Sequence, residues 1–127
     1  MQLIVLKKKY SIYRFANESH LPDWIYLSDF YSITKTKDEL SVVTLQDITD
    51  SENTISSKDW RIIKIAGPLD LSLIGIIAEI STILKNKSIP IFTVSTFDTD
   101  YILVKQKDLE VGIKALTEKG HNVILEE

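Results

Sequence analysis

Apolar residues in the second half of the chain change their spacing several times, and each change predicts a new element. Residues 60–65, 89–96 and 101–105 are rich in aliphatic and β-branched side chains, as buried strands are. Between the first two runs, apolar residues recur at the spacing of one helix face: Leu73, Ile76, Ile77, Ile80, Ile83 and Leu84. Leu109, Ile113 and Leu116 predict a second helix before a last strand at residues 122–125. The predicted order is βαββαβ, the ferredoxin-like arrangement.

Polar residues and glycines predict where these two helices begin and end. Asp70 or Ser72 lies where a side chain would cap the start of the first helix. Asp108 lies in the same place before the second helix, and Gly120 follows its end, where a left-handed residue is common.

The first half of the chain repeats part of this order in a reduced form. Residues 29–48 align without gaps on residues 90–109 at an offset of 61, and both segments contain two strand-like runs joined by a short polar turn. Residues 10–15 match the strand at residues 60–65, but the spacer of residues 16–29 has no helical stripe. A duplicated unit that lacks its first helix explains this pattern.

Two segments lie outside the repeat. Residues 49–59, TDSENTISSKD, are polar and predict a linker or a short turn of helix. Residues 2–7 form a further strand, which we expect to fill the edge that a last strand would occupy. We therefore divide the chain into a reduced N-terminal half, residues 1–58, and a complete C-terminal domain, residues 59–127.

Composition excludes several functions. With 127 residues, 44% of them hydrophobic and 26% charged, this is an ordinary soluble chain. Its net charge of −3 argues against nucleic-acid binding, which needs a basic surface. The absence of cysteine excludes disulfides and thiolate chemistry. The apolar N-terminal stretch is too short for a signal peptide or a membrane span, so we expect a cytoplasmic protein that does not act on membranes.

A resemblance to a known family rests on four short motifs in the second half of the chain. These are Gly67-Pro68-Leu69-Asp70, Gly75, Ser95-Thr96 and Thr99-Asp100-Tyr101. In these residues the chain resembles the ACT domain family, and more closely the paired ACT-like proteins related to cytosolic amino-acid sensors. The resemblance extends over residues 60–121 and, less closely, over residues 26–45. It implies an α+β ferredoxin-like fold with two ACT-like halves, the first of them reduced.

The resemblance also implies a ligand site. ACT domains generally bind small ligands, usually amino acids, where two domains meet, at the strand-to-helix loop and the strand that faces it. Carried over to this chain, the site comprises Ser72, Leu73, Ile74 and Gly75, with Ser95, Thr96, and Asp98 or Asp100 on the hairpin. A homodimer that binds an amino acid between its halves or between its subunits is the implied assembly.

Physical reasoning supports parts of this site and leaves alternatives open. We place Gly75 near the third position of the first helix, where a missing side chain would let a ligand carboxylate reach the backbone N–H groups. Close packing against a strand or a second subunit would also explain this glycine. Glu79, one turn later, fits either a contact to a cationic group or plain solvation. Asp98 and Asp100 fit either charge recognition or the chemistry of a tight turn.

Four classes of function remain to be weighed. A small-molecule sensor and a structural module that only dimerises or docks to a partner protein both fit the chain. An enzyme is not expected, because the sequence has no acid–base pair, metal cluster or phosphate loop, and His20 and His121 stand beside no nucleophile. We therefore expect no catalytic residue, metal or cofactor. RNA binding is disfavoured because residues 101–105, YILVK, lack paired stacking aromatics.

Overall fold

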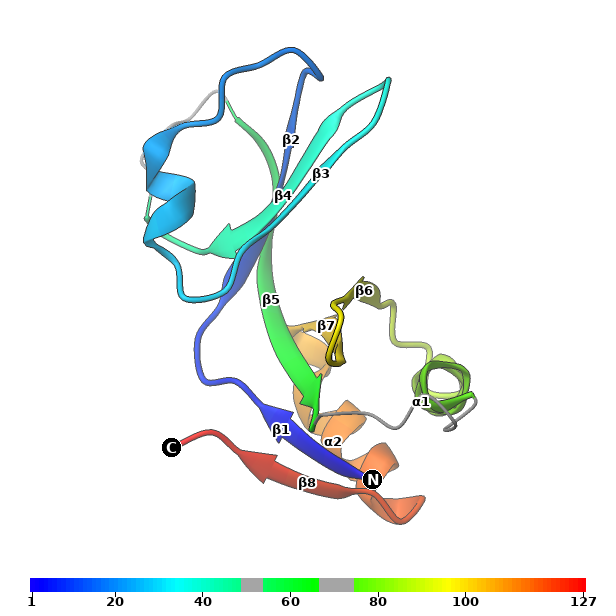
Figure 1. Ribbon diagram of the computed structural model, residues 1–127. Coiled ribbons are helices and arrows are strands. Elements are labelled where there is room, and N and C mark those ends of the chain that lie inside the picture. Colours follow the sequence, from blue (N-terminus) through cyan, green and yellow to red (C-terminus); the bar gives the residue numbers. More distant parts are fainter. Residues whose placement is uncertain (49–53, 67–74) are drawn as a thin grey trace. The chain divides into compact units, whose positions relative to one another are not determined.

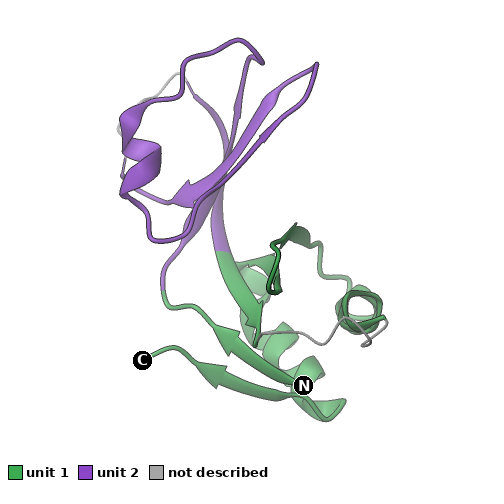
Figure 2. Cartoon of the chain, viewed as in Figure 1, with its two compact units in different colours: residues 1–7, 61–127 green, residues 8–60 purple. Residues whose placement is uncertain are grey.

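The computed structural model describes residues 1–48, 54–66 and 75–127, which fall into two compact units. Unit 1 consists of residues 1–7 and 61–127, and unit 2 consists of residues 8–60 (Figure 2). Residues 1–7 therefore lie with the C-terminal unit, whereas the sequence division placed them in the first half. The division of the chain into domains at residues 58 and 59 stays a prediction.

Unit 1 has the predicted βαββαβ order (Figure 1). Its elements are the end of β5 (Ile55–Ile65), α1 (Ile76–Lys85), β6 (Phe92–Ser95), β7 (Asp100–Lys105), α2 (Leu109–Glu118) and β8 (Asn122–Leu125). A short 3-10 helix, η2 (Gln106–Asp108), precedes α2. Asp108 occupies the N-cap position of α2, but its side chain makes no capping hydrogen bond. Gly120 has the predicted left-handed conformation, with φ +93°.

Strand β1 (Gln2–Val5) takes a place in unit 1 that the sequence did not indicate. It pairs antiparallel with β5, Leu3 opposite Ile65, and parallel with β8, Leu3 opposite Val123. β7 pairs with both β5 and β6. The first strand thus lies between β5 and β8 rather than at the edge of the first half. Its alternation explains this position, because Leu3 and Val5 point to one face of the sheet and are buried there.

Both helices pack their apolar stripes against that face of the sheet. Ile80, Ile83 and Leu84 of α1 and Leu109 and Leu116 of α2 join one core with Leu3, Ile63 and Ile102. Ile76, Ile77 and Ile113 are only partly buried beside it. Each fully buried aliphatic side chain contributes about 1.5–3 kcal/mol. The apolar faces that the sequence predicts for the two helices therefore hold these helices against the sheet.

Unit 2 is a reduced version of the same arrangement. It contains β2 (Tyr10–Phe15), the 3-10 helix η1 (Asp23–Leu27), β3 (Ser32–Lys35), β4 (Leu40–Leu45) and the beginning of β5, with the strand order β3-β4-β2-β5. η1 occupies the place of a first helix and buries Ile25 against Tyr13 and Val42. The mixed α+β, ferredoxin-like fold with a reduced first half is confirmed.

The prediction of a linker or helical turn at residues 49–59 is wrong for its second part. Residues 55–59 belong to β5, which pairs with β2 through Ile55 opposite Arg14 and Ser57 opposite Ile12. Their polar side chains carry no strand signal, but their backbone groups complete the hydrogen-bond ladder of β2. Residues 49–53 lie outside the described part of the chain.

The internal repeat is present, but its offset is 60 residues and not 61. Lys35 pairs with Leu40 across the turn of the first hairpin, and Ser95 pairs with Asp100 across the second. Both turns have the same hydrogen bond, from Thr36 N–H to Glu39 C=O in one and from Thr96 N–H to Thr99 C=O in the other. A shift of one residue matters, because it would move every side chain of a strand to the opposite face.

Candidate functional site

Gly75 lies immediately before α1 and not inside it. It is the N-cap residue, its φ is +81°, and it is exposed. This left-handed conformation is strained for residues with a Cβ atom, so the glycine is needed for the turn itself. No described atom lies within 4 Å of the place where a Cβ would be. The predicted position in the third residue of the helix is therefore wrong, whereas the space beside this glycine is free of other described atoms to a distance of 4 Å.

The beginning of α1 presents backbone donors. The first intrahelical hydrogen bond of the described helix runs from Glu79 N–H to Gly75 C=O, at 2.8 Å. The amides of Ile76, Ile77 and Ala78 precede that bond and have no intrahelical acceptor. An anion at such a position is stabilised by about 0.3–1 kcal/mol, and by up to about 2 kcal/mol where it is partly buried. Ser72, Leu73 and Ile74, the rest of the predicted loop, lie outside the described residues, as does Asp70.

Glu79 has a partner that sequence reasoning missed. One of its carboxylate oxygens lies 3.4 Å from Nε2 of His121, whose side chain is only 5% exposed. Within the described residues, neither ring nitrogen of His121 has a hydrogen-bond partner. The left-handed Gly120 and the bond from His121 N–H to Leu116 C=O turn the chain back after α2. Glu79 is therefore neither plainly solvated nor fully available to a ligand.

The β6–β7 hairpin brings the second group of predicted residues together. Ser95 Oγ donates to Asp100 Oδ1 at 2.5 Å, across the turn. Thr96 Oγ1 donates to Thr99 C=O at 3.1 Å and accepts from Thr99 N–H at 3.2 Å. Asp98 is exposed at the tip, beside the fully exposed Phe97. Hydrogen bonds within the turn therefore account for the hydroxyl group of Thr96 and for one carboxylate oxygen of Asp100.

Thr99 fixes this hairpin to the sheet. It is buried, and its hydroxyl donates to the carbonyl of Ile65, at the end of β5. Thr99 belongs to the residues that carry the family resemblance, but its anchoring role could not be predicted from the sequence, because it depends on a contact between residues 34 positions apart. Among the described residues, no hydrogen bond or ion pair joins the hairpin to Gly75 or Glu79. The predicted site thus consists of two groups, the start of α1 and the hairpin.

Two further features of the described residues bear on function. No three His, Asp or Glu side chains among them are gathered as a metal site requires. No helix within the described ranges is long and apolar enough to cross a membrane.

Comparison with known families identifies the class of protein that this fold defines. A model of the ACT domain matches residues 55–118, half of the chain, and a second model, described as an N-terminal domain, matches residues 8–52. The two matched ranges correspond closely to the second and first copies of the repeat. The chain belongs to the ACT domain family.

Solved structures agree with this assignment. A protein from Agobacterium tumefaciens has a similar structure, with a TM-score of 0.92 and 36% sequence identity over 99% of this chain and 93% of that one. The regulatory subunit of aspartate kinase from Thermus thermophilus, in its ligand-free form, has a TM-score of 0.61 at 11% identity, covering 87% of this chain and 92% of that chain. At this identity, the similarity concerns the fold alone.

A complete enzyme shows how this fold is used elsewhere. The aspartate kinase of Clostridium acetobutylicum, described as an allosteric enzyme, matches 91% of this chain with a TM-score of 0.68 and 14% identity. The match covers only 33% of that enzyme. No curated protein matches the sequence.

Proposed function

We propose that this protein is a small-molecule sensor of the ACT type that binds a free amino acid in the cytoplasm and acts as a homodimer. The observation that carries the proposal is the open, left-handed Gly75 at the start of α1, in a chain that belongs to the ACT domain family. The first turn of α1, which is partly exposed, offers backbone donors to a carboxylate, and every amino acid has one. The protein itself performs no chemistry in this proposal.

The remaining predicted residues have distinct roles in this proposal. Main-chain groups of Ser72, Leu73, Ile74 and Gly75 bind the ligand carboxylate. Hydroxyl groups of Ser95 and Thr96 contact its polar atoms, and Glu79, Asp98 and Asp100 attract its ammonium group. Asp100 has one oxygen engaged by Ser95, which leaves the other oxygen for a ligand.

A second function is favoured by one observation. Phe97, at the tip of the β6–β7 hairpin, is fully exposed, and a large apolar side chain in that position suits contact with another protein. In this alternative, the ACT surface serves only dimerisation or docking to a partner, and no metabolite binds.

Thermal unfolding in the presence of each common amino acid separates the two functions. A ligand present at about 100 times its dissociation constant stabilises the folded state by about 2.7 kcal/mol. The sensor predicts that at least one amino acid raises the unfolding temperature. It also predicts that Asp100→Asn weakens this effect, whereas Glu118→Gln, at the exposed end of α2, leaves it unchanged. If no amino acid stabilises the protein and it is an oligomer in solution, the sensor is refuted and the docking function is the one that fits.

A further inference from the structure

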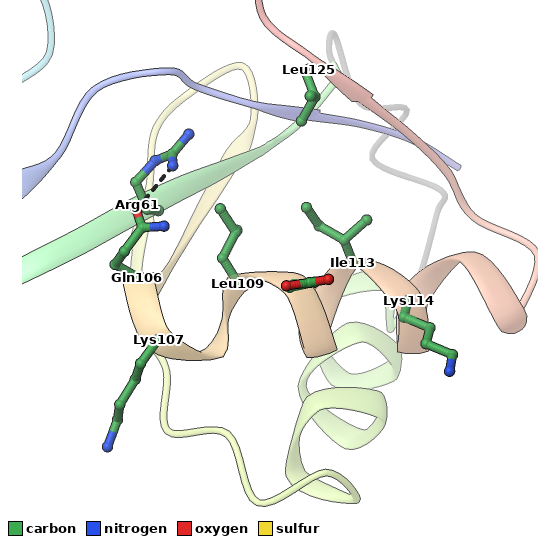
Figure 3. Close-up of a pocket in the computed structure, with 8 residues that line it drawn as sticks. Arg61, Gln106, Lys107, Leu109, Ile113, Lys114 and Leu125 are labelled. Atoms are coloured by element: carbon green, nitrogen blue, oxygen red, sulfur yellow. Dashed lines mark hydrogen bonds between the residues drawn. The ribbon is translucent and has the colours of Figure 1, made fainter.

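A cavity of about 550 Å³ lies in unit 1, lined by residues of α2, of β8 and of the segment that precedes α2, and by Arg61 of β5 (Figure 3). Arg61 and Gln106 lie at one end, and apolar side chains of Leu109, Ile113 and Leu125 line the middle. Leu109 and Ile113 extend from α2 toward Leu125 on β8 (Figure 3). The volume is in the range of about 300–1,000 Å³ that is usual for small-molecule sites. None of these residues belongs to the proposed amino-acid site.

Arg61 is the unusual residue of this cavity. Its Nε and Nη2 donate to the carbonyl of Leu6 at 3.3 and 2.8 Å, and its Nη1 donates to Gln106 Oε1 at 3.0 Å. All of these acceptors are neutral. Among the described residues, no carboxylate forms an ion pair with Arg61. A half-buried guanidinium with five N–H groups thus retains two donors and its whole charge.

Gln106 is oriented by the same contact. Because its Oε1 accepts from Arg61, its amide nitrogen is the group that remains available, and that nitrogen is a donor. Arg61 and Gln106 together therefore offer mainly hydrogen-bond donors to a ligand. Acceptors with a negative charge match this end of the cavity best, since charge-assisted hydrogen bonds are about twice as strong as neutral ones.

Side chains at the rim of the cavity make the local charge positive, although the chain as a whole is acidic. The lining residues include three cations, Arg61, Lys107 and Lys114, and one carboxylate, Glu110, whereas the net charge of the chain is −3. Lys107 and Lys114 extend away from the cavity in Figure 3, so they raise the local potential without filling the space. Glu110 reduces this potential, and Arg61 remains the charged group beside the apolar middle.

We propose that this cavity is a second ligand site, which binds a small organic acid through its carboxylate at Arg61 and Gln106 and through an apolar chain between Leu109, Ile113 and Leu125. An apolar chain is required because inorganic anions would leave the aliphatic surface in water. This site is independent of the amino-acid site at α1.

Hexanoate is a suitable probe, and NMR titration of the ¹⁵N-labelled protein locates its binding. The expected result is a shift of the Arg61 Nε–Hε signal and of the amides at residues 106–114. Acetate, which lacks the chain, and hexanol, which lacks the charge, should each bind at least about tenfold more weakly, because each loses one of the two contributions. Equal binding of hexanol and hexanoate would refute the role of Arg61.

Two matched variants test the site without removing Arg61, whose bonds to Leu6 also support the fold. Leu125 is 68% exposed and faces the cavity, and its neighbour Ile124, 40% exposed, points to the other face of β8. Both Leu125→Glu and Ile124→Glu add one negative charge to the same strand. The proposal requires Leu125→Glu to weaken hexanoate binding at least about tenfold and Ile124→Glu to leave it within about twofold. Equal affinities of the two variants would overturn the proposal.

Discussion

Replacing Gly75 by alanine tests the conformation at the start of α1, because two accounts of this glycine predict opposite signs. If Gly75 lay inside the helix, as its sequence position suggested, alanine would stabilise the protein by about 1 kcal/mol. The structure gives it φ +81°, which is strained for an L-residue by roughly 1–2 kcal/mol. No described atom lies within 4 Å of the added Cβ, so backbone strain is the effect that the described residues predict.

Urea unfolding measures this difference directly. With a typical urea dependence of about 2 kcal/mol/M, Gly75→Ala should lower the midpoint by about 0.5–1 M. Gly75→Asn should lower it less, because asparagine tolerates the left-handed region better than alanine does.

A second glycine gives the matched control. Gly112 lies inside α2, and a Cβ there would lie 3.4 Å from Leu84 Cδ2 and 3.6 Å from Ile89 Cδ1, which are ordinary contacts. Gly112→Ala should therefore stabilise the protein, by up to about 1 kcal/mol. An increase in the midpoint for Gly75→Ala, similar to that for Gly112→Ala, would refute the left-handed conformation at Gly75.

Further predictions concern the β6–β7 hairpin and the core of unit 2. Thr99→Val should cost about 1–3 kcal/mol in unfolding free energy, since it removes the hydroxyl that donates to Ile65 C=O, whereas Thr93→Val, exposed on the same hairpin, should change it by less than about 0.5 kcal/mol. Equal effects in thermal unfolding would show that the Thr99 bond contributes nothing. Ile25→Ala should cost about 2–5 kcal/mol, because Ile25 is the buried residue of η1. Chemical denaturation checks this value, and a loss below 1 kcal/mol would mean that η1 does not belong to the core of unit 2.

The elements that bury a regular apolar pattern could be predicted from the sequence. The stripes of α1 and α2, the strand at residues 122–125 and the left-handed Gly120 follow from local spacing and turn chemistry. The strand at residues 55–59 could not be predicted, because most of its side chains are polar and exposed and only its backbone pairing with β2 defines it. Long-range pairing overrides local propensity in such segments.

The candidate site also could be predicted from the sequence only in part. Glycine and polar residues at the start of a helix are visible in a sequence, and so are hairpin aspartates. The contact between Glu79 and His121 joins residues 42 positions apart, and the bond from Arg61 to Gln106 joins residues 45 positions apart. Such contacts depend on which elements the fold brings together. They could not be derived from spacing along the chain.

The central claim is that a free amino acid binds at the first turn of α1. The most direct measurement is an NMR titration of the ¹⁵N-labelled protein with each common amino acid, up to about 10 mM, so that dissociation constants of about 1 mM are still detected. We predict that one of them shifts the amides of Gly75, Ile76, Ile77 and Ala78 more than those of α2. If no amino acid shifts these four amides, the claim is wrong.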